Sequence, residues 1–401
     1  MPQALTHQML AREAAKMLME ENPVVKNVNT DRKIEFGEEI NGYKKGDTIR
    51  IKVPPVPTVF SGSNFAGGGA APAQNETEIP LTLDTQLHVP LTFTAKEKKL
   101  DLSEFRERFL RPAINSLSSG MNSNLLVRMK DLTPNVVGTW GTIPNTRTPY
   151  RNASSRLNRF LAPSGNTVRS LHFSSDANDA LAEANATLFH TRQELEAEFD
   201  QNAVGAFAGF TFFEQQSIPV HTNGAGTGYL VNGAGNTGSS LPVNTGTGAI
   251  TKGSIITITG VNAVHPITGA DMGVLRQFVV TADYAGGAGN LQIFPAISVT
   301  TASVVGTVSA LPAAAAPITI FGTASQGKRQ NLAFHRDAFA VGFAPLPVLA
   351  SCEGYTATMP GGVSIRVMTF GNGLTDQENT RVDVLFGLAG VRRDWATRLT
   401  E

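Results

Sequence analysis

The sequence predicts an α+β protein that carries an inserted all-β domain. The stretch from Thr222 to Gln326 contains only four charged residues and is otherwise rich in Gly, Ala, Thr, Val, Ile, Ser and Asn. The sequence on both sides of it shows helical periodicity and mixed charge. A segment of about a hundred residues is long enough to bury its own core. We therefore expect a β domain that interrupts an α+β parent domain.

Composition narrows the class of protein. The 401-residue chain has 33 Lys and Arg and 33 Asp and Glu, so its formal net charge is zero. This balance argues against a global nucleic-acid binder, which is normally basic, and gives little repulsion between copies. The single cysteine, Cys352, has no nearby histidine and is interpreted as a small core residue. No run of about eighteen apolar residues occurs, so no membrane span is expected.

The N-terminal part predicts a helix followed by a hairpin arm. Leu5–Glu21 has apolar residues at helical spacing and ends before Pro23, and this helix either covers the parent domain or forms an arm that docks on a neighbour. Thr48–Phe60 and Glu78–Lys96 alternate as strands do, around a tip rich in Gly and Ala at Ser61–Asn75. Because an isolated two-stranded hairpin is marginal in water, this arm requires a surface to lie on.

Asp101–Lys130 gives the strongest helix signal. Asp101 and Glu104 form a variant of the capping box. Pro112 should kink the helix and Gly120 should weaken its middle. One face carries an apolar stripe formed by Leu110, Ile114, Leu117, Met121 and Leu125.

The remaining elements are shorter. Helices are expected at Arg151–Leu161, from Ser175 onward with Ser174 or Ser175 as its cap, and at Leu195–Asn202. Strands are expected at Arg169–Phe173 and Phe207–Val220, and in the insert at Ser254–Gly260, Leu275–Ala282, Asn290–Thr301 and Ala315–Gly322. A final strand pair at Ser364–Gly371 and Arg381–Gly390 suits a sheet with one wet face.

No pattern of catalytic, cofactor-binding or metal-binding residues survives inspection. Gly233–Gly238 matches GxGxxG, but the following Ser239–Pro242 cannot open the helix that a pyrophosphate site needs. His335–Asp337 is similar to a kinase catalytic loop but lacks the required Asn. The seven histidines are scattered. The sequence therefore predicts no enzyme, no cofactor and no metal site.

Two groups of basic residues are clustered along the chain. Each group is either a solvated face or a surface that neutralises the backbone of a nucleic acid. The first group is Arg147, Arg151, Arg156 and Arg159, and the second is Arg392, Arg393 and Arg398.

Three further stretches occur in a specific order after the helix, the arm and the long helix. They are Gly209–Val220 before the insert, Lys252–Thr281 within it and Asn331–Pro347 after it. In this order the chain resembles the major capsid proteins of tailed bacteriophages, which share the Hong Kong 97 capsid fold. Within them it is similar to the coat protein type of the short-tailed Salmonella phage. The resemblance implies that the insert is immunoglobulin-like.

The resemblance also implies a division of the chain. It assigns an N-arm helix to 1–29, an extended β-hairpin loop with its flanks to 30–100, and the spine helix with the peripheral domain to 101–167. It assigns the axial domain to 168–221 and 327–370, the inserted β domain to 222–326, and a C-terminal strand that returns to the peripheral domain to 371–401.

The function implied by the resemblance is structural. Such proteins self-assemble as hexamers and pentamers into an icosahedral shell around double-stranded DNA, guided by a scaffolding protein and nucleated at a portal, with procapsid maturation. We therefore expect a virion capsid protein, assembled in the bacterial cytoplasm, with a decoration protein as an optional partner and without a membrane. Candidate inter-subunit contacts are Phe60, Phe65, Leu83, Asp271 and Arg276, and candidate scaffold contacts are Arg12 and Lys16.

One departure from the family pattern concerns the insert. In the prototype a charged loop of the inserted domain bridges capsomers by ion pairs, whereas His265–Arg276 here offers only Asp271 and Arg276. Exposed pairs contribute about 0–1 kcal/mol, so we expect the insert to support folding of the axial domain more than ionic bridging. One alternative is another virion protein, a tail-tube or decoration protein, although the long helix does not suit such a protein. The other alternative is an enzyme with a β accessory domain.

Overall fold

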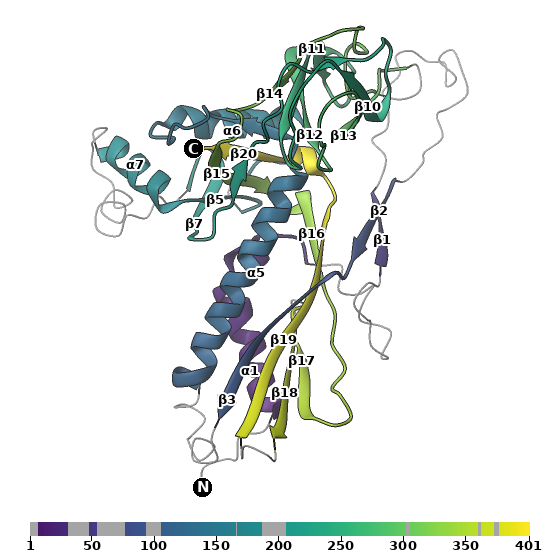
Figure 1. Ribbon diagram of the computed structural model, residues 1–401. Coiled ribbons are helices and arrows are strands. Elements are labelled where there is room, and N and C mark those ends of the chain that lie inside the picture. The colour runs from purple at the N-terminus through teal and green to yellow at the C-terminus, as the bar shows by residue number, and fades with distance from the viewer. Residues whose placement is uncertain are drawn as a thin grey trace, which may run out of the picture. The chain divides into compact units, whose positions relative to one another are not determined.

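The computed structural model describes residues 7–30, 48–53, 77–93, 106–165, 167–186, 206–301, 305–359, 362–372 and 377–401. The chain divides into two compact units (Figure 1). The first comprises Met1–Lys52, Glu78–Leu125 and Phe339–Val391, and the second comprises Val53–Thr77, Leu126–Ala338 and Arg392–Glu401. Each unit is assembled from segments that lie far apart in the sequence. The predicted helix at Leu195–Asn202 falls outside the described residues.

The first unit is built on a five-stranded antiparallel sheet. The strand order is β16-β19-β18-β17, and β3 also pairs with β19. The strand pair expected near the end of the chain is confirmed as β18 and β19, which pair from Ile365↔Val384 to Asn372↔Gln377. The strands are β3 (Thr85–Phe93), β16 (Phe339–Phe343), β17 (Glu353–Thr358), β18 (Ser364–Asn372) and β19 (Gln377–Gly390).

The expectation of one wet face on this sheet is wrong, because residues 382–386 of β19 are all buried. Asp383 among them is fully buried and is neutralised by two arginines. Arg366 donates to Asp383 Oδ2 through Nε at 3.2 Å and Nη2 at 2.8 Å, and Arg381 Nε donates to Oδ1 at 2.6 Å. A buried carboxylate persists only when it is paired and hydrogen-bonded in this way.

The N-terminal helix α1 (His7–Glu21) packs against β17 and β18. It is followed by the short helix α2 (Pro23–Asn27), whose first turn is capped by Asn22, since its Oδ1 accepts from the N–H of Val25 at 2.9 Å. The predicted apolar face is confirmed, and its small residues let the helix approach the sheet closely. The buried residues are Ala11, Ala14, Ala15, Met17 and Leu18.

The hairpin arm is only partly as expected. β1 (Thr48–Val53) pairs with β2 (Thr77–Thr82) in a two-stranded sheet. The second predicted strand does not continue to Lys96 in one piece, because β3 leaves the hairpin and pairs with β19 along its whole length. The chain crosses close to Gly387, where an added Cβ would meet the carbonyl oxygen of Thr82 at 2.1 Å. The predicted tip, 61–75, lies outside the described residues.

The long helix is confirmed over residues 106–132, and its predicted capping box, Asp101 and Glu104, lies outside the described residues. A π-helical turn, Arg106–Leu110, leads into α5 (Arg111–Leu132), which is about 33 Å long at 1.5 Å per residue. Pro112 is the second residue of α5, so the wide turn before it accommodates the missing N–H in place of a mid-helix kink. The whole predicted apolar stripe is buried, from Leu110 to Leu125.

The second unit contains a seven-stranded mixed sheet. Its order is β4-β20-β15-β5-β7-β6, with β8 also paired to β15, and it is antiparallel except for β4 with β20 and β5 with β7. Helices α6 and α7 cover one face and bury Tyr150, Leu157 and Leu181 against it. The elements are β4 (Asn135–Val137), α6 (Arg147–Arg159), β5 (Arg169–Phe173), α7 (Ser175–Ala186), β6 (Ala206–Phe207), β7 (Phe210–Glu214), β8 (Val220–Thr222), β15 (Gly327–His335) and β20 (Ala396–Thr400), with 3-10 turns at Arg336–Ala338 and Arg393–Trp395.

Local expectations for this sheet had mixed outcomes. β5 has the predicted bounds, and Ser174 caps α7 by accepting from the N–H of Ala177 at 3.1 Å. The strand predicted at Phe207–Val220 is wrong as a single element. Ala208 and Gly209 have positive φ angles of 52° and 81°, so they form a tight turn that separates β6 from β7.

The insert forms a closed six-stranded barrel. Its sheet order is β14-β11-β12-β13-β10-β9. The ring closes because β9 returns to the segment before β14, with Ile318 N donating to Tyr229 O at 2.9 Å and Val231 N donating to Ala316 O at 3.0 Å. The strands are β9 (Leu230–Val231), β10 (Gly238–Asn244), β11 (Ile255–Val264), β12 (Asp271–Val280), β13 (Gly289–Ile297) and β14 (Ile318–Ile320).

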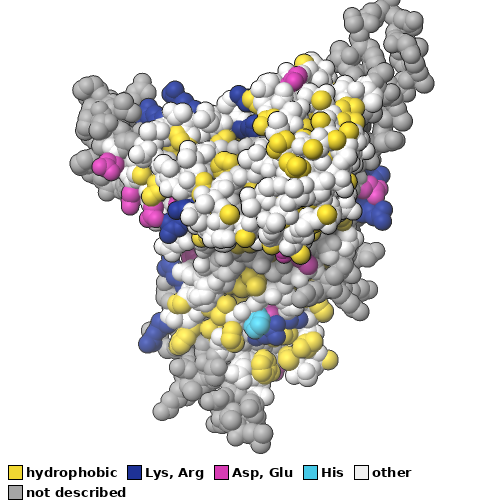
Figure 2. Space-filling model, turned by 45° about the horizontal axis from the view of Figure 1, so that its top comes forward, with side chains coloured by type: hydrophobic (Ala, Val, Ile, Leu, Met, Phe, Trp, Pro, Cys, Tyr) yellow, Lys and Arg dark blue, Asp and Glu magenta, His cyan; other side chains and the backbone are white. Residues whose placement is uncertain are grey.

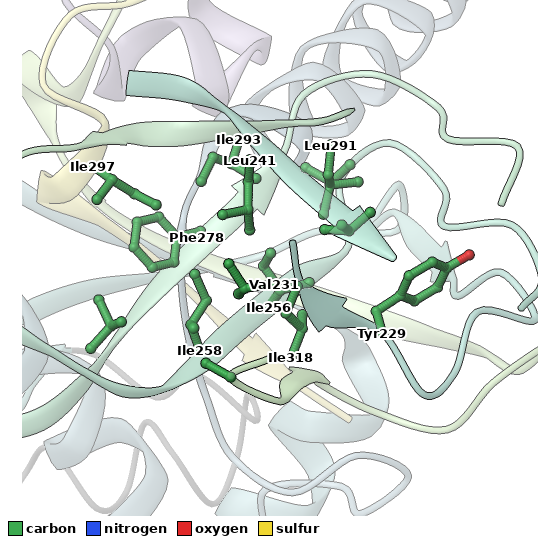
Figure 3. Packing of buried hydrophobic residues seen from close by; sticks show 14 of the residues in the cluster. Tyr229, Val231, Leu241, Ile256, Ile258, Phe278, Leu291, Ile293, Ile297 and Ile318 are labelled. Carbon is green, nitrogen blue, oxygen red and sulfur yellow. The ribbon is translucent and has the colours of Figure 1, made fainter. Parts of the chain in front are cut away.

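This topology corrects the expectation of an immunoglobulin-like insert, because such a domain has two separate sheets and the strands here form one ring. Sixteen buried residues between Tyr229 and Ile318 fill the barrel, among them Phe278, Ile256 and Leu291 (Figure 3). All of them belong to the insert. The barrel therefore has a core of its own, as expected from its length, and the four predicted strands are β11 to β14.

Candidate functional site

The barrel is fixed to the seven-stranded sheet by one glutamine of β12. Gln277 Oε1 accepts from the N–H of Val136 at 2.9 Å, and Gln277 Nε2 donates to the carbonyl oxygen of Val136 at 3.1 Å. The side chain thus occupies both backbone groups of edge strand β4 as a neighbouring strand would. A small apolar cluster of Val136, Ile255 and Val279 surrounds this contact.

Arg276, the preceding residue, makes an ionic and aromatic contact at the same junction. Its side chain is buried, and Nη2 donates to Asp394 Oδ1 at 2.5 Å. The guanidinium also lies over the ring of Phe160, 4.5 Å from its centroid. Arg393 stacks in turn on Phe294 of β13 at 4.4 Å. Two cation–π contacts and one ion pair therefore bind the barrel to residues on both sides of it in the sequence.

A buried polar cluster lies where α5 ends and the barrel begins. Lys130 Nζ donates to Asp131 Oδ1 at 2.6 Å and lies 3.1 Å from His221 Nδ1, and His221 Nε2 lies 3.2 Å from Ser254 Oγ. Burial lowers the pKa of Lys130, and the neighbouring carboxylate of Asp131 acts in the opposite direction. Burial first, and then the charges of Lys130 and Arg398, lower the pKa of His221 to about 3. The imidazole is therefore neutral at neutral pH.

Gly253 lets this cluster close. Its φ is +87°, and a Cβ there would lie 2.4 Å from Asp131 Oδ1. The left-handed backbone and the close carboxylate both require glycine. The amide of the preceding residue, Lys252, donates to Asp283 Oδ1 at 2.7 Å, so the turn is held from two sides.

The second basic group of the sequence is structural. Arg398 is buried, its Nη2 donates to the carbonyl oxygen of Thr133 at 2.9 Å, and burial lowers its pKa to about 9. Arg392 lies over the ring of Trp395, 4.7 Å from its centroid. Burial also lowers the pKa of Arg393. These cations stabilise the chain itself.

The predicted inter-subunit residues are distributed differently from the expectation. Asp271 is exposed, and its pKa is lowered by hydrogen bonds from Asn262 Nδ2 at 3.0 Å and the N–H of Gly273 at 2.7 Å. Arg276 is not beside it, because the side chain turns into the junction described above. The expectation of a surface role for Arg276 is corrected by this burial, whereas the role of Asp271 between subunits stays a prediction.

Leu83 also lies inside the protein. It is fully buried in a cluster with Ile51, Leu81 and Leu385, so in this conformation it stabilises the first unit and is not presented to a neighbour. Phe60 and Phe65 lie outside the described residues.

The predicted scaffold contacts are accessible. Arg12 and Lys16 are both exposed and lie one turn apart on the face of α1 opposite its buried alanines. Lys16 lies 3.9 Å from Glu20 in an exposed i, i+4 ion pair. Their role toward a scaffolding protein stays a prediction.

Sequence reasoning missed the junction residues. Gln277, Lys130 and His221 have partners 141 and 91 residues away, and no local motif marks them. Arg276 alone stands out in the sequence, because charges are rare in the insert. Among the described residues, no cluster of His, Cys, Asp and Glu could hold a metal ion. No helix in the described part of the chain is long and apolar enough to span a membrane.

Comparisons with known proteins identify the family. The profile of the family described as "P22 coat protein - gene protein 5" matches residues 68–396, well over half of the chain. No curated protein matches significantly.

Similar solved structures include Mycobacterium phage Che8, with 11% identity, 94% of this chain and 91% of that chain covered, and a TM-score of 0.49. The capsid of Ralstonia phage GP4 is 9% identical, with 89% of this chain and 84% of that chain covered and a TM-score of 0.41. The capsid of Cyanophage P-SCSP1u is 11% identical, with 91% of each chain covered and a TM-score of 0.40.

The family match confirms three expectations from the sequence, namely the family, the α+β capsid fold and the structural function. The long helix, the strand pair β18 and β19 and the barrel inserted between β8 and β15 all lie within the matched residues. The chain therefore belongs to the P22 coat protein family, as a major capsid protein whose copies form an icosahedral shell.

Proposed function

We propose that copies of this chain assemble as hexamers and pentamers, guided by a scaffolding protein and nucleated at a portal, into a shell that encloses double-stranded DNA. Assembly takes place in the bacterial cytoplasm. The observation that carries the proposal is the family match over residues 68–396.

The test is assembly of the purified full-length chain with and without its scaffolding protein, followed by electron microscopy. The expected result is closed shells whose reconstruction resolves hexameric and pentameric capsomers. A chain that stays monomeric under all assembly conditions contradicts the proposal. Deletion of 61–75 should leave the subunit folded and reduce shell yield. Replacement of the exposed Arg12 and Lys16 by Gln, which leaves the buried face of α1 intact, should reduce scaffold-directed yield in particular.

The barrel has a supporting role in this proposal. Its junction with the seven-stranded sheet is made by Gln277 and Arg276, so it braces edge strand β4 and the turn that carries Asp394. Figure 2, which brings the top of Figure 1 forward, shows few charged side chains over the barrel, where apolar and neutral atoms dominate. Support of the fold, and not ionic bridging between capsomers, is therefore its proposed task.

This role is tested by Gln277→Leu. The substitution leaves the N–H and C=O of Val136 without their partners, and two lost hydrogen bonds predict a loss of about 2–4 kcal/mol in unfolding free energy. Leu275→Ala, two residues away on the exposed side of β12, is the control and should cost less than about 1 kcal/mol. Equal effects of the two substitutions contradict the proposed anchor.

A further inference from the structure

Helix α6 has an exposed face that is basic and contains no acid. Its thirteen residues include four arginines and no Asp or Glu. Arg147, Arg151 and Arg159 are exposed, while Arg156 is buried among apolar residues. Neutral hydrogen-bonding side chains fill the exposed positions between them, namely Asn152, Ser155 and Asn158. The outward side of the helix is thus a row of cations and neutral polar groups.

Arg156, which points inward, is the arginine of this helix that has a structural role. The guanidinium of Arg156 lies 5.9 Å from the ring centroid of Phe160, and burial lowers its pKa to about 10. By contrast, Arg151 and Arg159 lack a carboxylate within ion-pair distance anywhere in the described part of the chain, and both remain in solvent. No acidic side chain of the described residues therefore neutralises the charges of these two arginines.

An aromatic ring orients two of the exposed guanidinium groups. Arg147 and Arg151 lie over Phe207, at 5.2 and 5.7 Å from its centroid. They are one helical turn apart, about 6 Å along the axis. Stacking on one ring reduces the conformational freedom of both side chains, so less entropy is lost when they bind an anion.

We propose that this arginine face, formed by Arg147, Arg151 and Arg159, binds the phosphate backbone of the enclosed nucleic acid. The inference rests on the proposed function, in which the shell surrounds DNA. Arginine matches phosphate geometry, and the neutral amides and hydroxyl beside it supply further donors to backbone oxygens. Contacts to phosphate oxygens carry no sequence information, so the proposed binding is independent of base sequence. The other basic group is less accessible, because Arg398 is buried and Arg392 and Arg393 are half-buried, whereas the three arginines of the face on α6 are exposed.

The first test measures binding of a fluorescent double-stranded oligonucleotide to full-length subunits as a function of salt. Each lost phosphate contact reduces the slope of log K against log salt by about 0.9, so Arg151→Gln with Arg159→Gln should reduce it by about 1.8. The matching double lysine variant should retain the slope. Arg12→Gln, an exposed arginine on α1, is the control and should leave the slope unchanged. An unchanged slope in the double Gln variant overturns the proposal, as does selective loss of polyglutamate binding, which would indicate an acidic protein partner.

The second test asks which side of the shell carries the face. Cys352, the single cysteine, is replaced by Ser, and Ser155→Cys places a thiol on the arginine face. A long polyethylene-glycol maleimide should label dissociated subunits and fail to label intact shells. Equal labelling of both overturns the inference while the shells themselves still support the proposed function, whereas failure to form any shell contradicts the proposed function instead.

Discussion

Acidification should destabilise the subunit through two buried histidines. His172 in β5 is fully buried between the rings of Phe213 and Phe334, whose centroids lie 5.3 and 5.4 Å away. Neither of its ring nitrogens has a hydrogen-bond partner among the described residues. Burial lowers the pKa of His172 to about 3. His221 has a similarly lowered pKa, for the reasons given above.

The sign of the effect follows from these shifts. The folded-state pKa lies below the unfolded value of 6.5, so the unfolded chain binds more protons between those two values and stability falls as pH falls. One pH unit corresponds to about 1.4 kcal/mol per group. Going from about pH 7 to about pH 5, each histidine should remove about 2 kcal/mol of unfolding free energy, and the pair about 4 kcal/mol.

Urea unfolding of the subunit at the two pH values measures this loss, and His172→Phe isolates one contribution. The variant should lose about 2 kcal/mol less than the wild type over the same interval, whatever the larger ring costs at neutral pH. Because carboxylates titrate equally in both proteins, they cancel in the comparison. If both proteins show the same pH dependence, the imidazole of His172 is not held neutral by burial. His172→Leu provides the same comparison without added volume.

Three other predictions concern stability. Gly253→Ala should reduce the free energy of unfolding more than Gly260→Ala does. Both positions have positive φ, but only at Gly253 would the added Cβ press against Asp131. Gly260→Ala should cost about 1–2 kcal/mol, measured by thermal or urea unfolding. Asp383→Asn should cost about 3–5 kcal/mol, since it leaves two arginines facing a neutral amide, and equal stability would show that the pair is dispensable. The excised fragment 222–326 should fold alone around its own core, with cooperative unfolding and dispersed NMR signals as the measurements, and a disordered fragment would contradict this.

Sequence patterns predicted individual helices and strands better than they predicted which segments contact each other. The stripe from Leu110 to Leu125 recurs with helical period, so its burial followed from spacing alone. The closure of the barrel could not be predicted in this way, because the pairing of Tyr229 with Ile318 joins short segments that have no periodic pattern. The junction was likewise hidden, since the partner of Arg276 lies 118 residues away. The scarcity of charge in the insert predicts an exposed Arg276, whereas its ion pair with Asp394 and its stacking on Phe160 stabilise the buried side chain.

The charges of the barrel lead to a last prediction about assembly. Asp283 accepts the backbone N–H of Lys252, Asp271 accepts from its own hairpin, and Arg276 is bound to Asp394. The insert thus carries few charges, Arg276 is neutralised within the chain, and the barrel offers a neighbour mainly neutral polar and apolar groups. Contacts of that kind are not screened by salt. Shell yield in the absence of DNA should therefore change little as salt increases, while binding of DNA to the arginine face of α6 falls steeply. Light scattering of assembly over a salt series compares the two, and a parallel loss of shells and DNA binding would show that capsomers are joined by exposed ion pairs after all.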